Sequence, residues 1–396
     1  MADQNELWPL PHNWSEDWGE SIEFKTEIIA SRDDDEQRRA LRALPRITYR
    51  FRSTLLDERG QAALARLAAR QGRSWVVPHA RQHTLLTNAI SAGTVNFTLD
   101  TDEAWGIVGM DLVFVRPDGS SEWGRIATYS GGAGTVVDTI LVDIPAGSKV
   151  HHGIRGRFTK ASSVQFFTTT YSDIKGDFMA EPGEVFRIDA GADTETYHSR
   201  PVWTEKPNWA TRPKIDFQEM REAVDYGFGV KDYGFPVDYI RRTIRATFLI
   251  RDQATQDSLY GFFVRRLGQQ RSFYMPSWIK EFNVTAITTA NVTVAGEEAD
   301  VLFDTDSSHR HIVIFKTDGT KVYAEVSGTA VVSGETVLTF LTAISAITLA
   351  DIQYMTWLLP CRMASDRVEF KWVTQEAAPV TIPVRTLRDD IFWGDI

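Results

Sequence analysis

Two stretches of this chain carry the same residue types in the same order, and this internal repeat constrains the fold more than any single motif does. Residues 8–24 contain Trp, Pro, Asn and Trp followed by Ile-Glu-Phe, and residues 203–217 contain a matching series that ends in Ile-Asp-Phe. Because similar spacing accompanies the similar residues, the sequence indicates two tandem copies of one structural unit.

We call the two matching segments, residues 8–24 and 203–217, the leaders. Each leader is followed by a pattern that predicts a strand and then a helix. Alternating residues at 47–51 and 244–248 predict the two strands. The helices are predicted by apolar residues about one helical turn apart, which are Leu64, Leu67, Leu259, Phe262 and Phe263.

Each predicted helix is followed by a glycine and a short aromatic strand. Gly72 and Gly268 lie where a helix commonly ends on a left-handed residue. The segments 73–78 and 271–276 then read Arg-Ser, three apolar residues and a proline. The order of a strand, a helix and a second strand is therefore expected in both copies.

Beyond each proline lies a segment rich in Thr, Val and Gly, and an Asp-Gly hairpin signal stands in both, at 118–119 and 318–319. Segments 164–166 and 368–370 are expected to return to the first unit of each copy as closing strands. The predicted fold is a β-rich α+β fold, with two tandem units of an antiparallel sheet plus one helix and a small β-barrel or sandwich inserted in each. The expected domains are 1–79 plus 161–190 with 80–160 inserted, a linker at 191–202, and 203–279 plus 362–390 with 280–361 inserted.

Composition narrows the classes of function. The chain has 396 residues and a formal net charge of -10, which opposes a general role in gripping nucleic acid. Cys361 is the single cysteine, so an intrachain disulfide is excluded and a thiolate metal cluster is not expected. The polar, acidic N-terminus and the lack of any run of about 18 apolar residues predict a protein made in a cytoplasm, without a secretory signal or a membrane span.

No residue pattern predicts catalysis, a cofactor or a metal ion. The best pair of metal-ligand candidates is His309 and His311, and without a companion carboxylate or cysteine cluster these are expected to be solvated hairpin histidines. The acidic run 33–36 before Arg38 is expected to be a solvated loop or helix start, and its best functional alternative is a subunit contact. The sequence therefore predicts a protein that is not an enzyme.

Three short motifs resemble one family. The first motif is Arg-Arg-Leu-Gly at 265–268, and the second is the aromatic strand that closes on Pro-Ser-Trp at 276–278. The third is Glu-Gln-Arg at 36–38, which precedes Pro-Arg at 45–46. Together they resemble the distal tail and minor tail-tip, or baseplate hub, proteins of long-tailed (siphovirus-type) bacteriophages and gene transfer agents.

The resemblance implies a tail-tube fold whose sheets and helices join neighbouring subunits into a ring at the tail tip of a virion. Two units in one chain leave two arrangements open, a hexamer with a double layer or a trimer that acts as a pseudo-hexamer. The implied partners are copies of itself, the tail tube protein, baseplate hub and tail fibre proteins and the tape measure protein, with DNA passing through the channel unbound. Candidate subunit-interface residues are the large aromatic and arginine side chains Arg38, Arg46, Trp75, Arg241, Arg242, Tyr260, Phe262, Tyr274 and Trp278.

The alternative from another class is a carbohydrate-binding tail module that touches the host surface through the inserted β segments. Trp105 and Trp123 are its candidate saccharide contacts, because aromatic rings of small β folds can stack on a sugar. A place in the core or in an interface is the favoured interpretation of both, given the area that a tryptophan buries.

Overall fold

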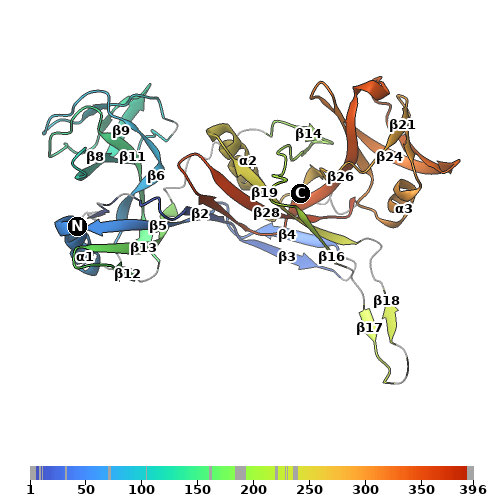
Figure 1. Cartoon of the computed structure of the whole chain (residues 1–396), viewed down its shortest axis with the longest axis horizontal. Helices are drawn as coiled ribbons and strands as arrows, with labels where there is room; N and C mark the ends of the chain where they lie inside the picture. The colour runs from blue at the N-terminus through green and yellow to red at the C-terminus, as the bar shows by residue number, and fades with distance from the viewer. Residues whose placement is uncertain are drawn as a thin grey trace.

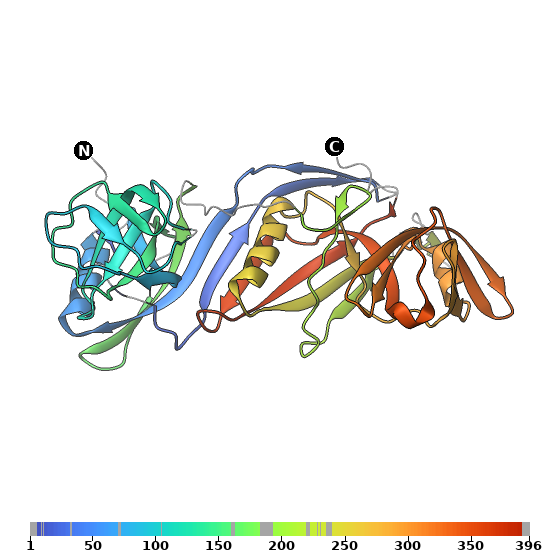
Figure 2. The ribbon, with the colours of Figure 1, turned by 90° about the horizontal axis from the view of Figure 1, so that it is seen from above.

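The computed structural model has a β-rich α+β fold with a large antiparallel sheet and, among the described residues, three α-helices. It is elongated, with the first half (residues 6–182) at one end and the second half (residues 193–389) at the other (Figures 1 and 2). The structure describes residues 6–389 apart from 9, 11, 32–33, 70–72, 104, 160–162, 183–192, 219–221, 228, 230 and 235–239.

One antiparallel run of strands passes through both halves, and we refer to it as the spanning sheet. Its order is β12 (Ser163–Phe166), β13 (Tyr171–Ala180), β5 (Arg46–Leu56), β2 (Trp18–Glu23), β27 (Arg367–Trp372), β28 (Ala378–Thr386), β19 (Arg241–Ile250) and β16 (Lys214–Gln218). The halves meet where β2 pairs with β27, and β2 is buried along nearly its whole length.

The predicted strand-helix-strand series is confirmed in both halves. Helix α1 (Asp57–Ala69) lies between β5 and β6 (Trp75–Leu85), and α2 (Gln253–Arg265) lies between β19 and β20 (Phe273–Pro276). The Asp252 carboxylate accepts a hydrogen bond from the Thr255 amide and so caps the start of α2. Gly268 ends this segment at a φ of 67°, as predicted, whereas Gly72 lies outside the described residues.

The first of the two segments that were expected to be inserted contains several strands and has a hydrophobic core of its own. Its strands are β7 (Asn96–Thr98), β8 (Asp111–Val115), β9 (Ser121–Ser130), β10 (Ala133–Val136) and β11 (Lys149–Phe158). Strands β6 and β11 pair along most of their length and connect the module to the rest of the first half. Gly119 takes the positive φ that the predicted Asp-Gly hairpin between β8 and β9 requires.

The second inserted segment contains strands and also a helix that the sequence interpretation missed. The strands are β21 (Val284–Ile287), β22 (Asn291–Ala295), β23 (His311–Lys316), β24 (Lys321–Val332), β25 (Glu335–Phe340) and β26 (Ile352–Met363), with a short 3-10 turn η2 (Leu349–Asp351). Helix α3 (Glu298–Thr305) was overlooked because the surrounding Thr and Val residues favour strands. The core of this module is continuous with the main core.

Short ladders complete the described fold, and one expected strand role is corrected. Strand β1 (Glu6–Leu7) pairs with β6, and β14 (Thr196–Tyr197) pairs with β15 (Arg200–Pro201) inside the expected linker. Residues 164–166 and 368–370 were expected to close each unit, but β13 and β28 are the strands that pair with β5 and β19. The expected segments form the preceding strands β12 and β27, because a hairpin in each half brings the next strand back.

Two hairpins extend from the spanning sheet. The first, β3 (Thr26–Ala30) with β4 (Glu36–Ala40), follows β2 and reaches from the first half along the second half (Figure 2). The second, β17 (Glu222–Val224) with β18 (Asp232–Gly234), follows β16 and projects away from the body (Figure 1). The side chains described at its tip, which include Asp225, Tyr226 and Tyr233, are exposed.

Candidate assembly interface

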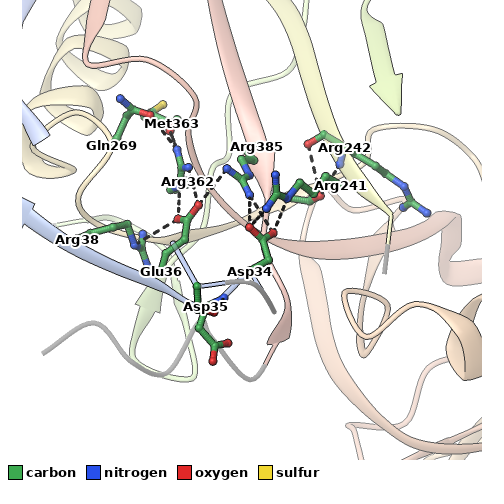
Figure 3. A network of polar contacts seen from close by, with 12 residues as sticks. Asp34, Asp35, Glu36, Arg38, Arg241, Arg242, Gln269, Arg362, Met363 and Arg385 are labelled. Atoms are coloured by element: carbon green, nitrogen blue, oxygen red, sulfur yellow. Dashed lines mark hydrogen bonds and ion pairs between the residues drawn. The ribbon is translucent and has the colours of Figure 1, made fainter. Parts of the chain in front are cut away.

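The β3–β4 hairpin is held on the second half by buried ion pairs (Figure 3). Asp34, in the turn before β4, accepts hydrogen bonds from Arg241 Nε at 2.5 Å and from Arg385 Nη2 at 2.9 Å. Asp34 has a φ of 66°, a left-handed conformation that Asp tolerates better than most residues. This turn therefore directs its carboxylate at two arginines of the spanning sheet.

Glu36 makes the second contact, at the start of β4. Arg362 donates to its two carboxylate oxygens at 2.8 and 2.9 Å, and Arg385 Nη1 lies 3.0 Å from it. Burial opposes ionisation of Glu36, but the hydrogen bond and charge of Arg362, together with the charge of Arg385, lower its pKa. Gln269 accepts from the same Arg362 at 2.9 Å, which fixes the direction of the guanidinium group.

Two members of the acidic run that was expected to be a solvated loop or helix start, Asp34 and Glu36, therefore make contacts within one chain, whereas Asp35 is exposed and residue 33 lies outside the described residues. Arg38 of β4 is buried and its Nε lies 3.8 Å from Glu36. Arg241, another of the candidate subunit-interface residues, takes part in the same cluster through Asp34. The sequence interpretation named Arg38 and Arg241 only as candidate contacts between subunits, and it missed Arg362 and Arg385, because no local pattern links residues more than 300 positions apart in the chain.

The second contact between the halves is the β2–β27 junction. Trp18 pairs with Trp372 and Ile22 pairs with Val368. The guanidinium carbon of Arg81 lies 3.2 Å from the ring centroid of Trp372, and Arg81 Nη2 donates to Gln256 Oε1 at 2.7 Å. Arg81, which lies on β6 in the first half, is another contact residue that the sequence did not reveal.

Five aromatic candidates for the subunit interface lie elsewhere than expected. They are buried inside the chain, so we assign them to its core rather than to its described surface: Trp75, Tyr260, Phe262, Tyr274 and Trp278. Trp75 packs on Trp8 with ring centroids 6.0 Å apart, and Phe262 packs on Trp203 at 4.8 Å. Large aromatic side chains serve cores and interfaces equally well, so their residue type alone could not separate the two.

The remaining arginine candidates differ from one another. Arg46 begins β5 and is exposed. Arg242 is largely buried and donates from Nη2 to Asp306 at 3.0 Å, so it ties β19 to the second inserted module. Of these two, only Arg46 is available on the surface of the described chain.

The two tryptophans proposed to touch saccharide are covered to different degrees. Trp105 is buried, and its ring stacks on His152 with centroids 5.9 Å apart. Trp123 on β9 is partly buried. Trp105 therefore belongs to the core of the first inserted module and does not present a face for a sugar.

Several histidines in and beside the two β modules are buried, including the two that were expected to be solvated. His309 and His311, expected on a solvated hairpin, lie in the interior, where His311 Nε2 is 3.0 Å from the Asp389 carboxylate. In the first module His79 stacks on His152, and burial lowers the pKa of His152 to about 4. Within the described part of the chain, no group of three or more His, Cys, Asp or Glu could hold a metal ion.

The spanning sheet ends in an open edge at each end. Among the described strands, β16 pairs only with β19 and β12 pairs only with β13. Phe217 on β16 is 65% exposed and Phe166 on β12 is 64% exposed. Each open edge therefore combines unpaired backbone groups with a large apolar side chain.

Two comparisons with known proteins found no match. No protein-family model matches the chain, and no characterised protein matches it significantly. None of the helices in the described residues is long and apolar enough to cross a membrane.

Proposed function

We propose that this chain is a structural protein of a virion, a component of the tail tip or baseplate of a long-tailed phage or gene transfer agent. In this proposal copies of the chain form a ring that connects the tail tube to the distal hub and leaves a channel for DNA, and the chain is not an enzyme. The observation that carries the proposal is the spanning sheet, which runs through both halves and is open at both ends. Open strands are the natural sites at which one chain extends its sheet with another.

The proposal includes two tandem tail-tube-like units, and matching backbone contacts support this. In each half the leader tryptophan bonds to the aromatic strand and the leader asparagine bonds to the strand before the helix. The four bonds are Trp8 N to Val76 O at 2.8 Å, Trp203 N to Tyr274 O at 2.7 Å, Asn13 N to Arg52 O at 2.7 Å and Asn208 N to Thr247 O at 2.7 Å. The shared geometry is what a duplicated unit would produce.

The same proposal treats the inserted segments as two related small β domains. Both begin after the aromatic strand and both carry an Asp-Gly hairpin, in which the Asp118 and Asp318 carboxylates accept from the amides two residues later at 2.8 Å. The net charge of -10 fits a channel component past which DNA slides without adhering.

Electron microscopy and mass photometry of the purified protein, with mass spectrometry of intact particles, test this function. The expected result is a closed assembly of several chains and the presence of the chain in purified particles. A chain that stays monomeric at all concentrations and is absent from particles would overturn the proposal. The number of chains in the ring separates the trimer from the hexamer.

A further inference from the structure

The two ends of the spanning sheet are related to the junction in its middle. Reading the sheet in order gives β12, β13, β5 and β2 from the first half, then β27, β28, β19 and β16 from the second. Each set runs from an outer hairpin strand to the strand that follows the leader. Strand β16 therefore has the same place in the second set as β2 has in the first. In the same way, β12 in the first set corresponds to β27 in the second.

The strand β2 is covered by a neighbour, and β16 is not. Phe24 directly follows β2 and is 1% exposed, because it packs on Phe263 of α2 in the second half, with ring centroids 5.9 Å apart. Phe217 ends the matching Ile-Asp-Phe segment of β16 and is 65% exposed. The same residue type is therefore buried where the chain supplies a neighbouring unit and exposed where the chain ends its sheet.

The leader tryptophans follow the same rule. Trp14, ahead of β2, is partly buried against the main core, whereas Trp209, ahead of β16, is 56% exposed. Trp209 and Phe217 are therefore both exposed on the segment that carries the open strand, whereas their counterparts beside β2 are covered.

The opposite edge has the complementary character. Strand β27 is paired with β2, but β12 has no described neighbour on its outer side, and Phe166 and Phe167 are both exposed there. A surface that fits β16 is therefore present on the same molecule, at the far end of the sheet.

From these observations we infer that β16 of one chain pairs in antiparallel fashion with β12 of a second copy, and so repeats between chains the β2–β27 junction found within the chain. Phe217 then packs toward α1 of the second copy, as Phe24 packs on α2. The contact is head-to-tail, since it joins two different surfaces, and it can therefore continue from copy to copy until a ring closes. This inference rests on the proposed function for its tandem units and names the edges through which the ring would form.

Two charge substitutions at exposed positions test the pairing. Phe217→Lys and Phe166→Lys each place a cation on one edge, where it opposes strand addition without disturbing the core. Each variant alone should lose assembly, with the assembled fraction falling at least about tenfold by mass photometry. Leu141→Lys, at an exposed position of the first inserted module, is the matched control and should assemble like the wild type.

Mixing the two variants identifies the edges that meet. An equimolar mixture keeps one intact β16 and one intact β12, so it should form a 1:1 dimer and nothing larger. Assembly of both variants at the wild-type level overturns this inference and leaves the proposed ring in place. A Phe166→Lys variant that assembles normally indicates pairing between like edges and also overturns it, and a wild type that never assembles overturns both proposals.

Discussion

Glu36 is buried beside more positive charge than it can neutralise alone, because Arg362, Arg385 and Arg38 all lie within 4 Å of its carboxylate. Asp34 supplies the second negative charge, so the cluster works only with the β3–β4 hairpin in place. Removing one member of a buried ion network leaves its partners without compensation, which costs more than the contact itself contributes.

Glu36→Ala should lower the free energy of unfolding by about 3 kcal/mol, since Arg362 and Arg38 lose the Glu36 carboxylate and Arg385 keeps only its contact with Asp34. Urea unfolding measures the loss, and hydrogen exchange should show β3 and β4 opening first. Glu27→Ala on β3, whose side chain is exposed, is the control and should change little. Equal stability of the two variants would mean that the cluster does not hold the hairpin.

His152 makes the first inserted module sensitive to acid. Its folded pKa of about 4 lies below the ordinary value of 6.5, so its contribution to stability is complete above pH 6.5 and is lost as the pH falls toward 4. The groups around it are His79, Gln82 and Trp105, and burial lowers the pKa of His79 as well.

Lowering the pH from 7.5 to 5 should reduce the free energy of unfolding by about 2 kcal/mol through His152 alone. Thermal unfolding followed by circular dichroism across this range measures the effect. His152→Phe keeps a ring between its neighbours and cannot be protonated, so its decline should be shallower. A variant that loses stability with pH as steeply as the wild type would refute the role of His152.

At the scale of the elements, local signals in the sequence were sufficient and distant ones were not. The Asp-Gly turns and the Gly268 end of α2 depend on a few adjacent residues, and the structure has them where they were predicted. The β2–β27 junction joins residues about 350 positions apart, and the contact of Arg81 with Trp372 joins residues about 290 positions apart. Such pairings depend on the register of whole strands, which no short motif specifies.

The β17–β18 hairpin allows a direct test at this scale. Gln218 and Arg241 pair at its base, so replacing residues 219–240 by Asn-Gly closes a tight turn between β16 and β19. Because the described side chains of the hairpin are exposed, the melting temperature should stay unchanged. Assembly should weaken, since the hairpin follows β16 as β3–β4 follows β2 and would reach the adjoining copy.

A Gly-Ser segment of the original length is the control for this replacement. Weak assembly in both variants assigns the contact to the hairpin residues themselves, and weak assembly only in the short variant assigns it to the reach of the segment. Normal assembly in both would exclude the hairpin from the contact.

For the whole molecule, the sequence predicted the β-rich α+β class and left the arrangement of the two halves open. Composition could indicate an acidic chain with large apolar contacts, but it could not tell that Trp75 and Tyr274 are buried against aromatic rings of their own halves while Phe217 is exposed. A residue that serves the core in one half can serve a contact surface in the other.

The net charge of -10 gives a prediction for the intact protein. Duplex DNA should run unretarded in a gel-shift experiment with the assembled protein at about 0.15 M salt, because an acidic surface repels phosphate. Retention that weakens steeply with added salt would instead reveal a cationic DNA-binding surface.

The β2–β27 junction lies within one covalent chain, and in a ring of the proposed kind this has a consequence for counting. Half of all junctions form during folding, at an effective concentration that does not depend on how much protein is made. Such a ring always holds an even number of units, and a missing chain leaves a gap two units wide. Incorrect pairing can then occur only at the junctions between chains. A ring of this kind therefore needs half as many correct encounters between chains as a ring of the same number of single-unit chains.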